Sequence, residues 1–232
     1  MLYITSFNYT LYKLTGRKFL KSFVKNVDEN IVIATEDTQV VENIDYNKNL
    51  CISHIGLSED YYHWIDKYGN MFSDIVGMKS RTIGWFTKFY SIYRVYKNYS
   101  FDYLLWIDCD CEVLKKVDKD DIIKIFGKSD IIYHYGLTRM QLNKGIESGI
   151  IGFKNSHISK RILDECYYNY YSGKFLDMKR WDDAWLFTKA IEKFPDGCKD
   201  LIKGYSSSGH VVQNGPFAHM VRHNKGTHKE LI

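Results

Sequence analysis

Short apolar runs alternate along this chain with longer amphipathic stretches, and their spacing predicts the secondary structure. Runs rich in β-branched and aromatic residues are typical of buried strands. They cover residues 2–6, 30–35, 50–55, 103–107, 131–135 and 149–153. Stretches with apolar residues at helical spacing predict helices. These cover residues 16–24, 58–68, 82–96, 119–126, 156–170 and 182–194.

Strands that alternate with helices predict an α/β fold with a doubly wound, mostly parallel sheet flanked by helices. Ligands of such sheets bind beyond the carboxyl ends of the strands. The 232 residues contain no linker, no repeat and no low-complexity tract, and they include two prolines. We therefore expect one domain over residues 1–232, which is a length that suits a single large α/β unit.

Two carboxylates, Asp108 and Asp110, follow directly after the apolar run at 103–107. On a regular strand they would share one face, with Cys109 and Cys111 on the other. Carboxylates this close together at a buried strand end repel each other unless a cation lies between them. Mn²⁺ and Mg²⁺ prefer such oxygen ligands and share them with phosphate groups. The alternative is a solvated pair in a surface turn.

The C-terminal segment carries a second pattern, His-x-x-Gly-x-x-Lys, at His223, Gly226 and Lys229. An imidazole can complete a carboxylate metal site, and a glycine lets the backbone approach a diphosphate closely. A lysine within reach neutralises a phosphate. The alternative is a frayed basic terminus, which is common at chain ends.

Charge and composition argue against several classes of protein. The net charge of +4 is mild and lacks concentrated Lys/Arg runs, so nucleic acid is not an expected partner. No stretch approaches the roughly 18–20 apolar residues of a membrane span, and no signal peptide is evident. Five cysteines without C-x-x-C spacing indicate reduced thiols and a cytoplasmic location.

Taken in order, these motifs resemble those of the metal-dependent GT-A glycosyltransferases, notably the retaining glycogenin-like group. They resemble more closely the α-galactosyl/xylosyltransferase family of fungi and plants, which has a Trp-x-x-Lys helix followed by an Arg and a Trp-rich strand that ends in Asp-Ser-Asp. The matching segments are residues 85–94, 103–110, 147–151, 181–186, 215–217 and 223–229. The resemblance implies the GT-A fold.

The resemblance also implies an activity, namely transfer of a hexose, deoxyhexose or pentose from a nucleotide diphosphate sugar to a glycan hydroxyl. By family analogy the nucleotide is UDP and the cofactor is Mn²⁺ or Mg²⁺. Asp110 and His223 would bind the metal, and Asp108 would bind the metal or the donor ribose. Gly226 and Lys229 would lie on the diphosphate.

Further donor contacts are implied at the start of the chain and on the helix expected at 82–96. Thr5, Ser6 and Tyr9 would line the base and ribose, and Lys88 and Arg81 would reach the donor. The alternative for Lys88 and Arg81 is an ordinary surface charge.

Two positions depart from the family pattern. Glu147 stands where relatives have Asn, and Asp183 stands where they have Gln, which adds acid near the expected sugar site. Asp182 is expected to cap the helix that follows it, which leaves Asp183 to face the sugar. The C-terminal pattern implies retention of configuration, whereas Asp183 acting as a base would imply inversion.

Two other classes of function stay open. A sugar nucleotidyltransferase also uses paired carboxylates with a divalent ion, but it would have a Gly-rich, basic phosphate loop after the first strand. A non-catalytic carbohydrate-binding protein would explain the aromatic residues but not the Asp pair together with the basic His segment.

Overall fold

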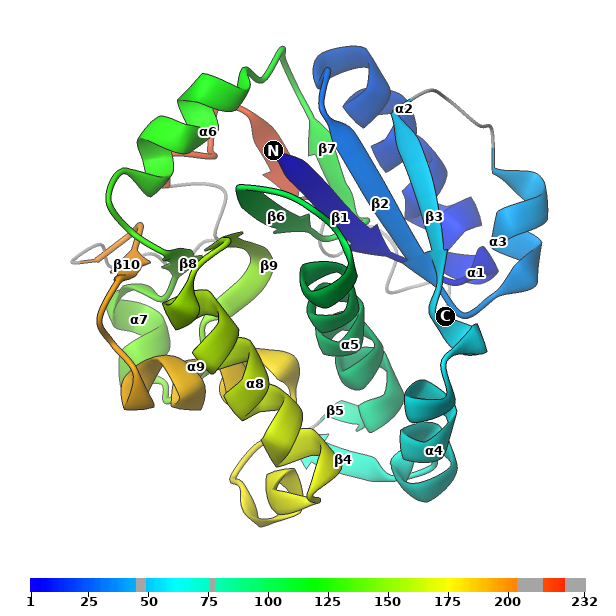
Figure 1. Cartoon of the computed structure of the whole chain (residues 1–232). Helices are drawn as coiled ribbons and strands as arrows, with labels where there is room; N and C mark the ends of the chain where they lie inside the picture. The colour runs from blue at the N-terminus through cyan, green and yellow to red at the C-terminus, as the bar shows by residue number, and fades with distance from the viewer. Residues whose placement is uncertain (45–48, 76–77, 204–214, 224–232) are drawn as a thin grey trace.

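The computed structural model describes residues 1–44, 49–75, 78–203 and 215–223, with the side chains of 72–81 outside the described part. The strands, drawn in Figure 1, are β1 (Leu2–Ser6), β2 (Asn30–Thr35), β3 (Leu50–His54), β4 (Phe72–Ile75), β5 (Met78–Arg81), β6 (Tyr103–Ile107), β7 (Cys111–Val113), β8 (Ile131–His134), β9 (Glu147–Lys154), β10 (Cys198–Asp200) and β11 (Val221–His223). The helices are α1 (Tyr9–Leu11), α2 (Arg17–Asn26), α3 (Thr38–Asn43), α4 (Glu59–Tyr68), α5 (Thr82–Asn98), α6 (Lys119–Phe126), α7 (Gly136–Gln141), α8 (His157–Tyr171) and α9 (Asp183–Lys193), with short η1 (Tyr12–Gly16), η2 (Ile55–Leu57) and η3 (Lys174–Asp177) turns.

Seven strands form the central sheet in the order β10-β8-β9-β6-β1-β2-β3. Neighbouring strands are parallel except at β9, which runs antiparallel to both β6 and β8. The predicted doubly wound, mostly parallel sheet is therefore confirmed. Two small antiparallel pairs, β4–β5 and β7–β11, lie outside the central sheet.

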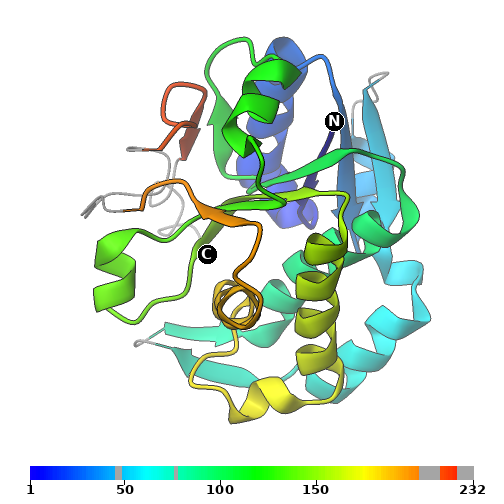
Figure 2. The same ribbon diagram turned by 60° about the vertical axis from the view of Figure 1, so that its left-hand side comes forward.

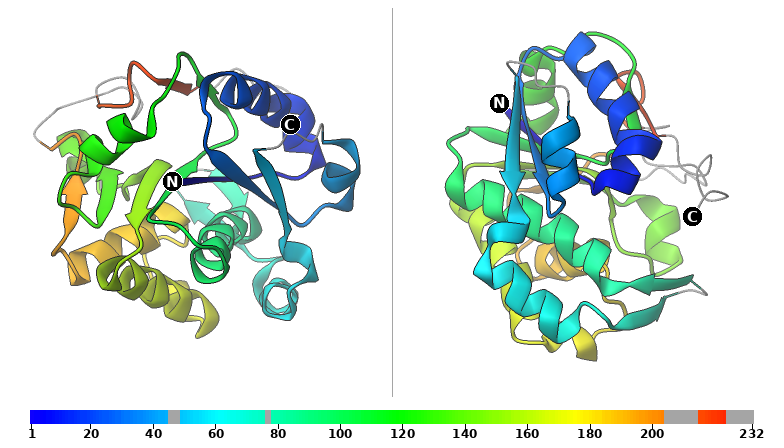
Figure 3. Two further views of the ribbon diagram at one scale, coloured as in Figure 1. Left: turned by 45° about the horizontal axis from the view of Figure 1, so that its top comes forward. Right: turned by 90° about the vertical axis from the view of Figure 1, so that its right-hand side faces the viewer.

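Alternation along the central strands builds two apolar layers. Ile4 and Trp106 belong to one buried cluster with α5, α8 and α9, while Tyr3 and Leu105 belong to the other with α2 and α6. Figure 3 shows α2 on one side of the sheet and α5 on the other. Burial on both faces removes the polar alternation of a half-exposed strand, which explains why the strands read as continuous apolar runs.

The elements predicted from periodicity are confirmed to within a few residues, with one difference at α4. Ser58, the first residue of the predicted range 58–68, lies at the N-cap position of α4, but its side chain makes no capping hydrogen bond. Its hydroxyl lies instead 2.5 Å from the Tyr90 hydroxyl on α5. No helix in the described ranges is both long enough and apolar enough to cross a membrane.

Candidate active site

Asp108 leaves β6 at the carboxyl edge of the sheet, and hydrogen bonds hold it there. Its backbone N–H donates to the Gly149 carbonyl on β9 at 2.9 Å. Its Oδ1 accepts from the Lys88 ammonium and from the Trp106 indole N–H, both at 2.7 Å. Burial alone would raise the pKa of Asp108, but the charge of Lys88 and these hydrogen bonds hold it well below its usual range. Asp108 is therefore ionised.

A tight turn follows, and it places Asp110 against the C-terminal segment. The Cys111 N–H donates to the Asp108 carbonyl at 3.1 Å, so residues 108–110 leave the strand and the expected alternation of side chains does not hold. The chain then re-enters extended structure as β7, which pairs with β11 (Figure 2). This pairing places the His223 Nε2 2.9 Å from Asp110 Oδ1 and 3.9 Å from Asp108 Oδ2.

The protonation of His223 follows from these two neighbours. Burial lowers the pKa of its imidazole, but contacts with Asp108 and Asp110 outweigh burial and raise it to about 9. Because β11 pairs with β7 up to His223, the alternative of a frayed terminus does not hold for the chain up to this residue. The structure brings together all three predicted metal ligands, two carboxylates and one imidazole, at one edge of the sheet.

Lys88 on α5 links this group to a third acid. Its Nζ lies 3.1 Å from the Ser148 hydroxyl and 3.6 Å from Asp183 Oδ2, in addition to its bond with Asp108. Its side chain is 13% exposed, so it is not a surface charge. Burial lowers the pKa of Lys88, but the charges of Asp108 and Asp183 more than offset that effect and raise it. Lys88 is a buried ammonium that joins two carboxylates.

The start of α9 divides two roles between adjacent acids. Asp182 caps the helix, because its side chain accepts the Trp185 N–H at 3.1 Å, and it pairs with Arg180 at 2.8 Å. The predicted capping role is confirmed. Asp183 is buried and turns to Lys88. Burial raises the pKa of Asp183, and the nearby ammonium acts in the opposite direction.

Glu147 begins β9 and is held by a residue that the sequence patterns did not indicate. The Arg139 Nη1 donates to Glu147 Oε2 at 2.7 Å. The other guanidinium nitrogens donate to the carbonyls of Gly145 at 2.7 Å and Ile146 at 3.1 Å. Arg139 lies on α7, which is a short helix without a clear periodic signal. The one signal in the sequence was that Arg139 precedes Glu147, a predicted site acid, by eight residues.

Gly149 brings no side chain between these groups. A Cβ at this position would lie 3.3 Å from Asp108 Oδ2, 3.4 Å from Glu147 Oε1 and 3.7 Å from His223 Nε2. Two carboxylates and an imidazole thus surround the point at which a side chain would begin. Oxygen and imidazole donors around one gap fit a divalent cation such as Mn²⁺.

The residues predicted to line the base and ribose lie at the end of β1. β1 pairs with β6 through Ile4 and Trp106, so Thr5 and Ser6 reach the same edge as Asp108. The Thr5 hydroxyl is buried and has no hydrogen-bond partner among the described residues. The Tyr9 N–H donates to the Asp37 carboxylate at 2.9 Å. Arg81 ends β5 with its side chain outside the described part, and Gly226 and Lys229 lie outside the described residues altogether.

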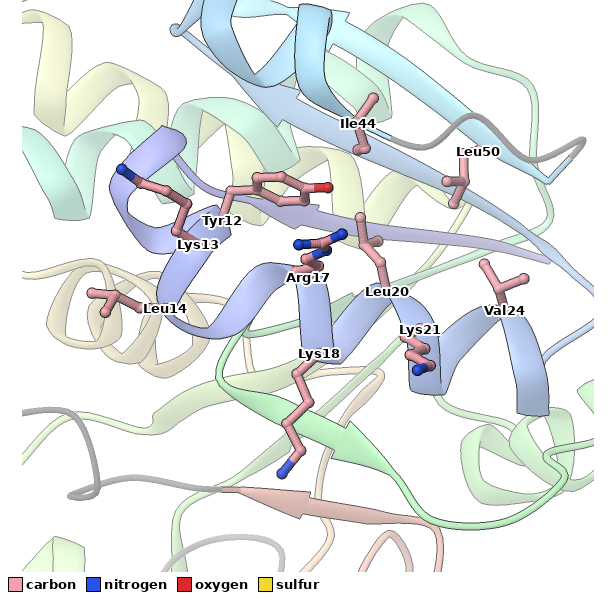
Figure 4. Close-up of a pocket in the computed structure, with 10 residues that line it drawn as sticks. All are labelled: Tyr12, Lys13, Leu14, Arg17, Lys18, Leu20, Lys21, Val24, Ile44 and Leu50. Atoms are coloured by element: carbon pink, nitrogen blue, oxygen red, sulfur yellow. The ribbon is translucent and has the colours of Figure 1, made fainter.

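A separate hollow of about 710 Å³ lies beside α2 (Figure 4). Its floor is apolar, with Leu20 from the helix and Ile44 and Leu50 from beyond it, and its cations include Arg17 and Lys18. Among the described residues that line it, none is acidic and none belongs to the group around Asp108. The hollow is therefore distinct from the candidate site.

Lys88→Met should lower the free energy of unfolding by about 3 kcal/mol, because it leaves the buried Asp183 carboxylate and the partly buried Asp108 carboxylate without their cation. Urea unfolding followed by circular dichroism measures this change. Lys124→Met is the control, because Lys124 makes an exposed pair with Asp121 at 3.3 Å and such pairs are worth about 0–1 kcal/mol. Equal effects of the two substitutions would contradict the structural role of Lys88.

The comparisons with known proteins address the fold. No protein-family model and no curated protein sequence matches the chain. Apo mouse xyloside xylosyltransferase 1 superposes with a TM-score of 0.55 at 11% identity, over 86% of this chain and 84% of that one. The apo glycosyltransferase GlyE of Streptococcus pneumoniae TIGR4 also gives 0.55 at 11% identity, over 83% of this chain and 43% of GlyE. At such identities the likeness shows the fold alone, and this chain has the GT-A fold that its motif order predicted.

Proposed function

We propose that the chain is a metal-dependent glycosyltransferase that moves a sugar from a nucleotide diphosphate donor, a UDP-sugar, to a glycan hydroxyl. The carrying observation is the convergence of Asp110 with His223, and of Asp108 with Lys88 and Asp183, beside Gly149, which has no side chain to separate them. This group lies at the carboxyl edge of the sheet, where α/β folds bind their ligands. The printed names of the structural neighbours, a xylosyltransferase and a glycosyltransferase, agree with this class of reaction.

One half of the site would bind the donor. Asp108, Asp110 and His223 would hold Mn²⁺ or Mg²⁺, which supplies Lewis-acid stabilisation to a diphosphate leaving group. Gly226 and Lys229 would contact the diphosphate, and Arg81 would reach it from β5. Thr5, Ser6 and Tyr9 would line the base and ribose, where the unpartnered Thr5 hydroxyl is a candidate donor of a hydrogen bond.

The other half would face the sugar. Asp183 and Glu147 bring two buried carboxyl groups to the site, and each is held by a cation, Lys88 for the first and Arg139 for the second. We propose retention, with Asp183 stabilising positive charge that develops on the sugar. Inversion is the competing course, and it would make Asp183 the base that deprotonates the acceptor.

We also propose that residues 1–232 act as one domain and work in the cytoplasm. All five cysteines are free thiols. Reduced thiols of this kind suit a reducing compartment better than an oxidising one.

The deciding experiment incubates the full chain with Mn²⁺ and a panel of UDP- and GDP-sugars and measures nucleotide diphosphate release. We expect release with a UDP-sugar, and we expect a chelator to stop it. A nucleotidyltransferase would instead consume a sugar phosphate and a nucleoside triphosphate with release of pyrophosphate. A carbohydrate-binding protein would show no turnover, and either result would overturn the proposal.

Gly149→Ala should weaken Mn²⁺ binding by about 10–100-fold, the usual size of a change next to metal ligands. The added Cβ presses on Asp108 and Glu147 without straining the backbone. Isothermal titration with Mn²⁺ measures the affinity. Gly84→Ala is the control, because a Cβ at Gly84 meets nothing within 4 Å. An unchanged affinity in a folded Gly149→Ala protein would place the metal elsewhere.

A further inference from the structure

Cys111 lies on the same side of its strand as the predicted metal ligand His223. The two residues are direct partners in the antiparallel ladder between β7 and β11. Partners of this kind project their side chains to the same face, with Cβ atoms about 4.5–5.5 Å apart. Regular alternation from β6 would have placed this thiol on the face opposite to the aspartates. The turn at 108–110 interrupts the alternation and so changes the face that the Cys111 side chain occupies.

Asp110, Cys111 and His223 are close enough to share one ion. Their candidate ligand atoms, a carboxylate oxygen, a sulfur and an imidazole nitrogen, all lie within 4.8 Å of one another. Ligand atoms around a tetrahedral Zn²⁺ are about 3.3–3.5 Å apart, as bond lengths of about 2.0 Å to N or O and 2.3 Å to S require. An ion would therefore need only small side-chain adjustments, which widen the 2.9 Å contact between Asp110 and His223 and bring the sulfur closer.

Asp108 is less available than Cys111 as the third ligand of an ion bound by Asp110 and His223. Its Oδ1 is already bonded to both Lys88 and Trp106 at 2.7 Å, and its Oδ2 is 3.9 Å from His223 Nε2. Cys111 is 2% exposed, so its sulfur lies on the buried side of the same pair of strands. Cys111 belongs to the buried cluster with α2 and α6, whereas α5, which carries Lys88, packs in the other cluster.

The chemistry of this donor set differs from that of the carboxylate pair. Oxygen ligands favour Mg²⁺ and Mn²⁺, whereas thiolate and imidazole favour Zn²⁺ and other softer ions. Three protein ligands that include Cys and His leave a fourth position open, as in catalytic zinc sites. The same two residues, Asp110 and His223, would serve both kinds of site.

We propose that Asp110, Cys111 and His223 form a thiolate-containing site that takes Zn²⁺, in competition with the Mn²⁺ of the donor site. The inference rests on the proposed function only through the two shared ligands. Zn²⁺ bound in this way withdraws Asp110 from the donor metal. It therefore inhibits Mn²⁺-dependent turnover in proportion to its occupancy.

The test titrates the reduced, metal-free full chain with Co²⁺ and records the near-ultraviolet absorption that arises when a thiolate binds this ion. Wild type should show the band, and added Zn²⁺ should remove it. Cys111→Ser should lose the band and bind Zn²⁺ at least about 10²-fold more weakly, beyond the usual cost of an outer-shell change. Cys109→Ser is the control and should keep the band, because the Cys109 thiol accepts a hydrogen bond from Thr15 at 3.6 Å.

A band that persists in Cys111→Ser, or Co²⁺ binding by wild type without a band, would overturn the site. If Cys111→Ser does not fold, zinc X-ray absorption spectroscopy of the wild-type protein shows without any variant whether a sulfur atom binds the ion. One sulfur among the atoms bound to the ion supports the inference, and none overturns it.

UDP release with Mn²⁺ is measured in parallel. Release without a thiolate band overturns this inference alone, and a band without release overturns the proposed function alone.

Discussion

Asp110→Ala should abolish Mn²⁺-dependent binding of the sugar nucleotide and leave the fold intact. A metal that neutralises a diphosphate is worth several kcal/mol, so we expect donor affinity to fall by about 10²–10³ at 1.4 kcal/mol per tenfold. The Asp110 side chain is 32% exposed and lies in a turn, so its loss leaves no cavity in the core. The buried His223 imidazole loses its 2.9 Å contact with this carboxylate, so the free energy of unfolding should fall by about 1–3 kcal/mol, and the protein should still fold.

The measurement is calorimetric titration of a UDP-sugar into wild type and variant, with Mn²⁺ and with a chelator. Asp121→Ala is the matched control, because Asp121 is an exposed acid in the first turn of α6. The control should bind donor as wild type does. Full affinity in Asp110→Ala, or full activity of wild type in a chelator, would disprove the metal assignment at this turn.

Much of this architecture follows from local pattern alone. β6 is a run of five apolar residues between polar ones, and α5 keeps apolar residues at helical spacing over four turns. Apolar patterns of this length seldom arise by chance, so they predict a strand and a helix reliably. The role of Thr5 came from the family resemblance, and the pairing of β1 with β6 in the structure puts this residue at the same edge of the sheet as Asp108.

The parts that the patterns missed depend on distant residues or on very short segments. β7 and β11 each have three residues, too few for a periodic signal, and each is stabilised by the other across a long stretch of chain. The turn between β6 and β7 changes which face Cys111 occupies, and alternation cannot foresee a turn that tertiary contacts select. The Arg139 contact with Glu147 likewise depends on α7, a helix of six residues.

Lys88 shows how one buried cation can connect the two halves of the site. It contacts Asp108, which we propose as a metal ligand, and Asp183, which we propose faces the sugar. A buried ammonium between two carboxylates is stable only while both partners stay in place, because an unpaired buried charge is costly. The position of Asp183 is therefore determined by the same residue that positions Asp108. A variant that changes the charge of Asp183 but not its shape tests the sugar side separately.

Asp183→Asn should lower turnover by about 10²–10⁴, the usual range for a positioned acid or base, with donor affinity little changed. The substitution preserves size and hydrogen bonding and removes the charge that would act on the acceptor hydroxyl or on the developing oxocarbenium ion. Steady-state rates and calorimetric donor binding separate the two effects. Asp182→Asn is the control on the neighbouring residue, because Asn caps a helix as well as Asp does.

Product stereochemistry then assigns the role of the carboxylate. The anomeric coupling constant of the wild-type product distinguishes the two courses by nuclear magnetic resonance. Retention would make Asp183 an electrostatic residue beside the sugar, held in position by Lys88 at 3.6 Å. Inversion would make it the base. Near-normal turnover in Asp183→Asn, with Asp182→Asn equally active, would remove Asp183 from the reaction under either stereochemistry and leave it a partner of Lys88 in the core.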